Sequence, residues 1–238
     1  MIPLRDENPS STTPVVTRVL IALNIAAFLY ELSMGSYLGY FVRGWGLIPE
    51  RISLALSGAE PVPGALLTVF TSMFLHGGWI HLVGNMWYLH IFGDNIEDRL
   101  GHLRFLGFYL AAGAVSAALH MLANPGSPIP TVGASGAIAG VLGAYAYAFP
   151  RARVITLVPI FILLQVMALP ALVVLGLWFV VQIFSGSLAL GTGATGGVAW
   201  WAHIGGFAFG VLFMALFGRG ERPAGAAPEA PSRAWVDE

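Results

Sequence analysis

The sequence predicts an all-α, polytopic membrane protein built as a bundle of six transmembrane helices. Hydrophobic residues make up 57% of the 238-residue chain and charged residues only 10%, and the mean hydropathy is +0.77. Soluble globular domains fall well outside this range. Because each crossing takes about 20 residues, six crossings with their loops fill the chain and leave no room for a second folded domain.

Six apolar runs are the predicted helices. They cover residues 20–33, 79–93, 103–123, 133–149, 168–185 and 200–217. We expect residues 1–14 to be a cytoplasmic N-terminal segment, residues 15–217 to be the membrane domain, and residues 218–238, rich in Pro, Ala, Gly and charge, to be a disordered cytoplasmic tail. Residues 35–75 are too interrupted by prolines to form one span, so we expect a loop embedded in the membrane or its interface.

One stretch complicates the count of spans. Residues 154–184 are almost uninterrupted apolar sequence and would make a helix of roughly 45 Å, against a hydrocarbon core of about 30 Å. Pro159 and Pro170 break this run. We expect residues 154–169 to be interfacial or re-entrant and to precede the fifth span. The alternative, an extra span over 154–169, would reverse the direction of the last helix.

Charge predicts the orientation. All basic residues are arginines, and in the six-span arrangement all but Arg43 and Arg51 lie on one side. The positive-inside rule therefore places both termini in the cytoplasm, and we expect the inner or plasma membrane of a prokaryotic cell. No cysteine is present, which excludes disulfides and thiol catalysis, and no basic surface for nucleic acid is evident. The lipid bilayer is the expected environment of the chain.

Four polar residues stand near the starts of helices that begin on the outer side. Ser135 and His203 lie two to three residues into the fourth and sixth spans, and His81 and Asn85 lie on one face of the second span. Polar groups in hydrocarbon are costly unless they face the interior of the bundle. We therefore expect them to share a cavity, where the free N–H groups of helix N-termini would favour a developing oxyanion.

Small residues in the two relevant helices favour close packing. The fourth span carries Gly136-x-x-x-Gly140 followed by Gly143, and the sixth carries Gly206-x-x-x-Gly210. Such patterns let helix backbones approach each other, which would bring Ser135 to His203. Glycine is also common in membrane helices, so generic packing is an equally simple interpretation of these patterns.

The motifs together resemble the rhomboid family of intramembrane serine proteases. They are Gly133-Ala134-Ser135-Gly136, Ala202-His203-Ile204-Gly205-Gly206 and His76-x4-His81-x3-Asn85. The resemblance implies a six-helix rhomboid-like bundle and an endopeptidase whose substrates are transmembrane proteins. It also implies that these are single-span proteins cut near the outer face, at small residues next to helix-weakening ones.

The resemblance also implies the role of each motif residue. Ser135 would be the nucleophile and His203 its general base. Asn85, His81 and the Ser135 backbone N–H would form the oxyanion hole. Gly133 and His76 would lie with the oxyanion and substrate-binding groups, His76 in a supporting role. Glu97 and Arg99 match a structural motif at the inner end of the second span.

The remaining features are weaker signals. Residues 186–199 contain five glycines and are either a mobile lid over the site or a simple connector. We expect neither a cofactor nor a metal, because no His-Glu-x-x-His motif or third ligand accompanies His76 and His81. We also expect no carboxylate to complete a catalytic triad, and an aromatic neighbour such as Trp200 to help orient His203.

Two alternative functions remain open at this stage. A catalytically inactive rhomboid-like protein would bind transmembrane clients with the same fold, although such a protein would be expected to lack the serine or the histidine. A channel or transporter would use intramembrane His and Asn as a polar path. A transporter would more naturally show repeated halves, and no clear internal repeat is present.

Overall fold

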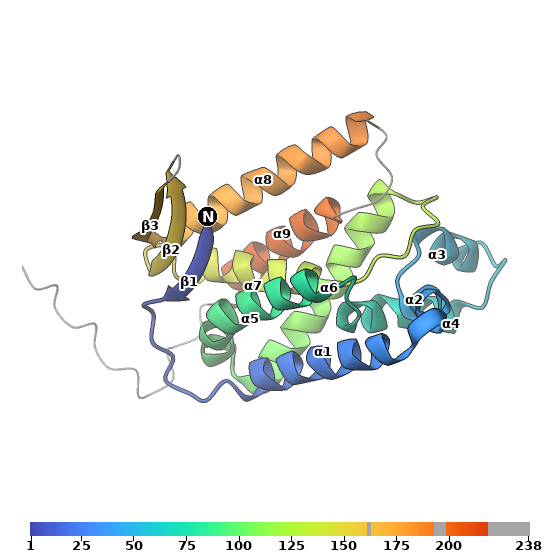
Figure 1. Cartoon of the computed structure of the whole chain (residues 1–238), viewed down its shortest axis with the longest axis horizontal. Helices are drawn as coiled ribbons and strands as arrows, with labels where there is room; N and C mark the ends of the chain where they lie inside the picture. Colours follow the sequence, from blue (N-terminus) through green and yellow to red (C-terminus); the bar gives the residue numbers. More distant parts are fainter. Residues whose placement is uncertain (161–162, 193–198, 219–238) are drawn as a thin grey trace, which may run out of the picture.

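The computed structural model describes residues 1–160, 163–192 and 199–218, and the predicted tail at 219–238 lies outside them. The described part consists of a helical bundle with a small sheet at one end (Figure 1). Its helices are α1 (Val15–Ser33), α2 (Leu38–Trp45), α3 (Pro49–Leu56), α4 (Val62–Thr71), α5 (Trp79–Leu100), α6 (His102–Ala123), α7 (Ser135–Ala148), α8 (Ala171–Thr192) and α9 (Trp200–Phe217). Its strands are β1 (Ile2–Asp6), β2 (Arg153–Ile160) and β3 (Leu163–Pro170).

All six predicted apolar runs form helices, namely α1, α5, α6, α7, α8 and α9. Within the described residues, α1, α6, α8 and α9 are long and apolar enough to cross a membrane by themselves. Helix α5 passes the same test only together with the α4 segment, from which it is bent by 81°. Helix α7 has 14 residues, about 21 Å, and is short for a full crossing. The fold is thus a mostly helical membrane bundle with four such helices, or five with the bent pair.

Helix α7 forms the centre of the bundle and is buried along nearly its whole length. It packs most extensively against α9, and also against α6 and α5. The glycines of α7 and α9 face each other: a methyl group at Gly206 would overlap the carbonyl oxygen of Gly136, and one at Gly210 would overlap that of Gly140. This backbone contact confirms the close packing of the two helices and brings their N-terminal ends together.

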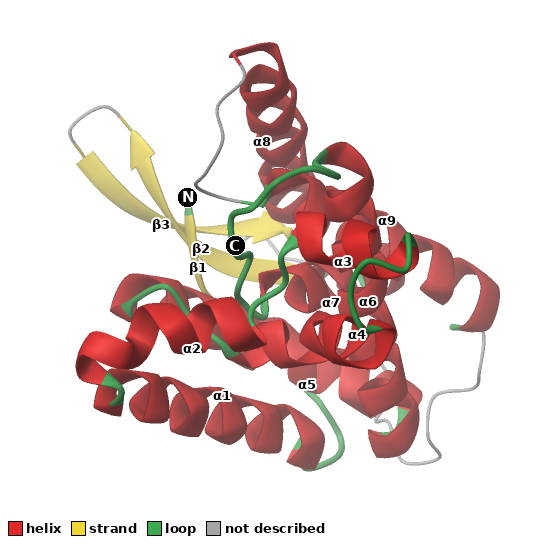
Figure 2. Cartoon of the chain, turned by 90° about the vertical axis from the view of Figure 1, so that its right-hand side faces the viewer, coloured by secondary structure: helices red, strands yellow, loops and turns green. Residues whose placement is uncertain are grey.

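The long connection between α1 and α5 is folded into short helices. Helices α2, α3 and α4, with the 3-10 turns η1 (Gly35–Tyr37) and η2 (Ser72–Phe74), occupy it. Figure 1 shows α2, α3 and α4 at the end of the bundle away from the sheet, and Figure 2 faces that end. Leu47, two residues after the end of α2, pairs with Thr131 in the loop before α7. The connection therefore supports the loop that leads into Ser135, while its placement in the membrane interface stays a prediction.

The sheet corrects the expectation of an exclusively helical chain. Residues 154–169, expected as an interfacial or re-entrant stretch, form the antiparallel hairpin of β2 and β3, and β1 pairs with the free edge of β2. An apolar run of this kind looks the same in hydropathy whether it forms a helix or a strand. The hairpin also excludes the extra span, because the Ala171 N–H donates to the Ala152 carbonyl, so α8 starts at the end where α7 stops.

The N-terminal segment is folded onto the same end of the bundle. The Asn8 side chain donates a hydrogen bond to Asn95, and the side chains and backbone of Ser11 and Thr12 donate to Asp98.

The buried carboxylate of Glu97 caps the start of α1. It accepts hydrogen bonds from the Val16 and Thr17 backbone N–H groups at 2.8 and 2.7 Å. A carboxylate at this position satisfies free donors at the start of α1 and interacts favourably with the helix dipole. Arg99 donates to the Gly218 carbonyl at the end of α9.

Candidate functional site

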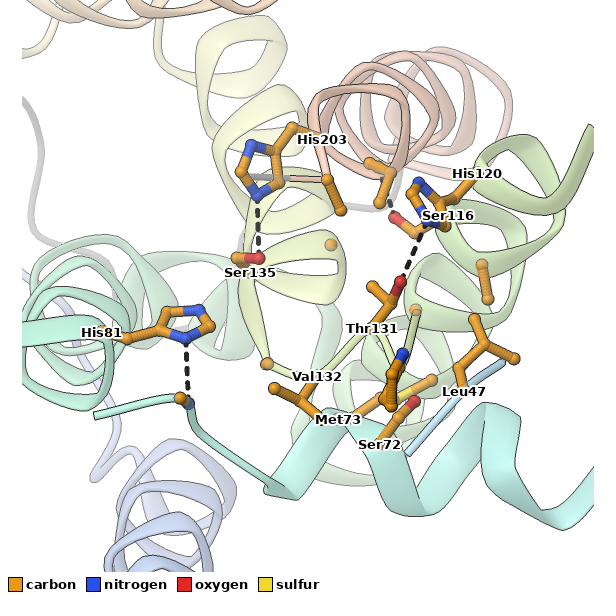
Figure 3. Close-up of a pocket in the computed structure, with 18 of the residues that line it drawn as sticks. Leu47, Ser72, Met73, His81, Ser116, His120, Thr131, Val132, Ser135 and His203 are labelled. Carbon is orange, nitrogen blue, oxygen red and sulfur yellow. Dashed lines mark hydrogen bonds between the residues drawn. The ribbon is translucent and has the colours of Figure 1, made fainter. Parts of the chain in front are cut away.

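Ser135 and His203 form a direct hydrogen bond. Ser135 is the first residue of α7 and His203 lies in the first turn of α9. The His203 Nε2 and Ser135 Oγ atoms are 2.8 Å apart, and Figure 3 shows the two side chains pointing toward each other. The glycine contacts between α7 and α9 hold these helices close enough for this pair to form. A hydroxyl bonded to an imidazole nitrogen is the arrangement of a base-activated nucleophile.

Gly133 sets the path of the chain into Ser135. Its φ of +127° is unfavourable for any residue with a side chain. A Cβ atom at this position would also lie 2.7 Å from the Nε2 atom of His81, which real contacts do not tolerate. The Gly133 N–H donates to the Ser72 carbonyl of η2 at 2.9 Å. Glycine is therefore required here for both the backbone conformation and the space taken by His81.

The opposite wall is supplied by the start of α5. The Gly77 N–H donates to His81 Nδ1 at 3.3 Å, so neutral His81 carries its proton on Nε2, the atom next to Gly133. Asn85 Nδ2 donates one of its two hydrogens to His76 Nε2, which lies 2.9 Å away. The second Asn85 hydrogen stays available. His81 and Asn85 thus place two N–H donors beside the loop that precedes Ser135.

His76 lies behind this wall and does not line the cavity. It is 3% exposed, its ring packs edge-on to His81 at 5.1 Å, and its Nε2 atom bonds Asn85. Its backbone N–H donates to the buried carboxylate of Glu31 at 3.1 Å. The structure therefore brings together Ser135, His203, His81, Asn85 and Gly133 around one cavity. It places His76 in the layer that supports Asn85.

The cavity has a volume of about 950 Å³. It extends from Ser135 and His203 past the loop before α7 to Ser116 and His120 of α6 (Figure 3). Among the described residues that line it, none is Asp, Glu, Lys or Arg. Ser135, Gly136 and Ala137, the first residues of α7, line this cavity, and the first N–H groups of a helix have no helical partners. An uncharged cavity with these donors suits a neutral peptide segment and a developing oxyanion.

Two residues of α8 that contact His203 were not expected from the sequence. Gln182 of α8 places its Oε1 atom 2.7 Å from His203 Nδ1. Trp178 of α8 packs against the His203 ring at 5.7 Å, in addition to the expected neighbour Trp200 at 6.3 Å. Contacts of this kind join residues from different helices, and no spacing of residues in the sequence indicates them.

The predicted loop at residues 186–199 is shorter than expected. Helix α8 continues to Thr192, so residues 186–192 are helical. The run of small and apolar residues continues the helix past Gly186. Residues 193–198 lie outside the described part of the chain. In the part of the chain that the structure describes, no group of three or more His, Asp or Glu side chains is placed to hold a metal ion.

Comparisons with known proteins show which proteins this chain is similar to. The sequence-family model described as the rhomboid domain matches residues 63–220 of this chain. The chain is 34% identical over 157 residues to presenilin-associated rhomboid-like protein A, mitochondrial, of Danio rerio, covering 62% of this chain and 37% of that protein. It is 32% identical over 156 residues to rhomboid protein 1, mitochondrial, of Saccharomyces cerevisiae, covering 62% and 40%.

A third relative is bacterial. The chain is 35% identical over 135 residues to rhomboid protease GluP of Bacillus subtilis, covering 56% of this chain and 24% of that protein. The chain thus spans less than half the length of each of these three relatives. Because the family model matches well over half of the chain, and does so across the helices that carry Ser135 and His203, the chain belongs to the rhomboid family.

Proposed function

We propose that this protein is an intramembrane serine endopeptidase that cleaves transmembrane protein substrates with a Ser135–His203 dyad. The observation that carries the proposal is the 2.8 Å contact between His203 Nε2 and Ser135 Oγ, at the rim of an uncharged cavity in a membrane bundle. The likeness to a relative described as a rhomboid protease supports it.

The chemistry follows from the positions of the groups. His203 Nε2 takes the Ser135 proton while Oγ attacks the substrate carbonyl carbon. The negative oxygen that forms is stabilised by N–H donors of Asn85, His81 and the Ser135 backbone. The C–N bond then breaks, and His203 returns the proton to the leaving amine. A water molecule, activated by the same nitrogen, hydrolyses the acyl-enzyme and regenerates Ser135.

The proposed setting is a bilayer with both termini in the cytoplasm and cleavage near the outer face. It rests on the distribution of the arginines and on the family resemblance. The chain is an integral membrane protein by its helices. Its relatives include two mitochondrial proteins and one from Bacillus subtilis, so they do not favour a prokaryotic membrane over others.

The test is proteolysis in proteoliposomes. The full chain and its Ser135→Ala variant are reconstituted with a panel of single-span substrates that carry small residues near one end of the span. We expect cleavage by the wild type alone. Binding of substrate without cleavage would support a client-binding protein, and ion or solute flux without cleavage would support a channel or transporter. Equal cleavage by both proteins would remove Ser135 from the mechanism.

A further inference from the structure

Gln182 is a buried amide on a helix whose other surface is apolar and open. It is 5% exposed, whereas its neighbours Val181 and Ile183 are 48% and 42% exposed. Helix α8 packs along one side of the bundle against α9 (Figure 1). A glutamine in a membrane helix is costly unless its amide is hydrogen-bonded. Its partner therefore indicates why the residue is placed there.

That partner is the base of the proposed dyad. The Gln182 Oε1 atom lies 2.7 Å from His203 Nδ1. An amide oxygen can only accept a hydrogen bond, so His203 Nδ1 must carry the proton. Neutral imidazole has a single N–H, which leaves a lone pair on Nε2. That lone pair is directed at Ser135 Oγ, 2.8 Å away.

A second residue of α8 fixes the plane of the same ring. Trp178 is four residues before Gln182 and so lies on the same face of α8. Its ring centroid is 5.7 Å from that of His203, with 37° between the planes. Helix α8 therefore supplies both an acceptor at Nδ1 and an aromatic surface against the ring. The buried acid Glu31, at the end of α1, accepts a hydrogen bond from the His76 backbone N–H.

We propose that Gln182 is a positioning residue that holds His203 in the Nδ1–H tautomer, the form in which Nε2 can accept the Ser135 proton. In hydrolases with a triad an aspartate has this task, and the wrong tautomer costs about 10⁴-fold in kcat. A neutral acceptor performs the orienting part of that task without burying a charge in the bilayer. The effect on catalysis rests on the proposed function, whereas the tautomer does not.

Two near-isosteric substitutions separate positioning from packing. Gln182→Met keeps the volume and removes the acceptor, while Gln182→Glu keeps the acceptor. If Gln182 positions His203, Gln182→Met lowers kcat by about 10- to 100-fold, as expected when a hydrogen bond to a group that becomes charged is lost. KM then stays within about twofold. Gln182→Glu keeps kcat within about tenfold of the wild type. A residue that only fills space would give the opposite order, since methionine packs better than a buried carboxylate.

The direct readout is the tautomer of His203. Two-bond ¹H–¹⁵N correlation spectra of the full chain, labelled with ¹⁵N-histidine, reveal which ring nitrogen carries the proton at pH 8. We expect Nδ1–H in the wild type and in Val181→Met, the control at the neighbouring exposed position. A growing Nε2–H population is expected in Gln182→Met. An Nε2–H tautomer in the wild type, or an unchanged spectrum together with unchanged kcat in Gln182→Met, overturns the inference.

The outcomes distinguish this inference from the proposed function. A wild type that cleaves no substrate, but shows the Nδ1–H tautomer lost in Gln182→Met, would contradict the protease while supporting the positioning role. A wild type that cleaves substrate, together with a Gln182→Met variant whose kcat and tautomer are unchanged, would support the protease and contradict the positioning role. If Gln182→Met does not fold, the wild-type tautomer and the kcat of Gln182→Glu still test the positioning role.

Discussion

At the residue scale, Asn85 and His81 each have one hydrogen-bonding group engaged by a neighbour and one N–H left beside the loop that precedes Ser135. Asn85 gives one amide hydrogen to His76 and keeps the other. His81 accepts from Gly77 and keeps Nε2–H. The engaged group fixes the rotamer, so the remaining donor is held in place before a substrate arrives. Such preorganised donors act most strongly on charge that develops only in the transition state.

This arrangement predicts a loss of turnover for Asn85→Ala. Removing one oxyanion donor costs about 10²- to 10³-fold in kcat, and KM should change much less. Steady-state kinetics on a cleaved substrate measure both values. Asn24→Ala is the matched control, because Asn24 is also a buried amide in a membrane helix but donates to the Leu20 carbonyl of its own helix. A normal kcat with a raised KM in Asn85→Ala would make Asn85 a substrate-binding residue.

At the scale of the elements, the geometry of the site depends on the contact between α7 and α9. Motifs of small residues in the sequence predicted this contact, because only glycine permits backbones to approach so closely. The sequence did not reveal that α8 contributes Gln182 and Trp178, since a lone polar residue in an apolar helix does not indicate its partner. It also did not reveal the β2–β3 hairpin, because hydropathy alone does not separate an apolar strand from a helix.

Gly206→Ala should therefore loosen the site as well as the fold. The added methyl group would overlap the Gly136 carbonyl and lie 2.6 Å from Ser116 Oγ. Overpacking of this kind typically costs about 1–3 kcal/mol, and separating α7 from α9 should also reduce cleavage. Thermal unfolding in detergent and the cleavage rate are the measurements. Gly107→Ala in α6, where an added methyl meets nothing within 4 Å, is the control and should leave both near wild type. Equal effects of the two variants would contradict the packing argument.

The docking of β1 predicts a dependence of stability on pH. Burial raises the pKa of Asp6 to about 6, with repulsion from Asp94 adding to this, although the Tyr145 hydroxyl that donates to Asp6 works against it. An unfolded aspartate titrates near 3.9, so the folded state holds the proton more tightly. Stability should therefore be greater below about pH 4 and fall as the pH rises through 6.

The measurement is the unfolding temperature between pH 4 and pH 7 in wild type and Asp6→Asn. The wild type should lose more stability across this window than Asp6→Asn does. Glu7→Gln, which removes an exposed carboxylate beside Arg153, should keep the wild-type dependence. Identical curves for wild type and Asp6→Asn would show that burial of Asp6 has no such effect.

At the scale of the whole molecule, the hairpin decides the direction of the helices. The chain enters and leaves the hairpin at the same end of the bundle, because α8 begins beside the end of α7. Helices α7 and α9 therefore start at the same end, which is the condition for Ser135 to meet His203. Apolar runs in the sequence located α1, α5, α6, α7, α8 and α9, while the number of these helices that span the membrane was not predictable from hydropathy. The short α7 and the bent α4–α5 pair depart from a simple span.

Cysteine accessibility tests the orientation, and the chain offers a clean background because it has no cysteine. Ser57→Cys, exposed in the connection between α3 and α4, should be labelled by an impermeant maleimide from outside intact cells. Arg151→Cys, exposed beside the hairpin, should be labelled only after the membrane is permeabilised. The reverse pattern would place the proposed site on the cytoplasmic side.

The most direct test of the dyad is covalent labelling of its nucleophile. Purified full-length protein is treated with a fluorophosphonate, and the modified residue is mapped by mass spectrometry. We predict a single adduct on Ser135 in the wild type, since His203 activates only that hydroxyl. Ser135→Ala and His203→Ala should stay unlabelled while keeping the wild-type unfolding temperature. An unlabelled wild type that is folded, or equal labelling of Ser135 in His203→Ala, would contradict a serine–histidine dyad in this protein.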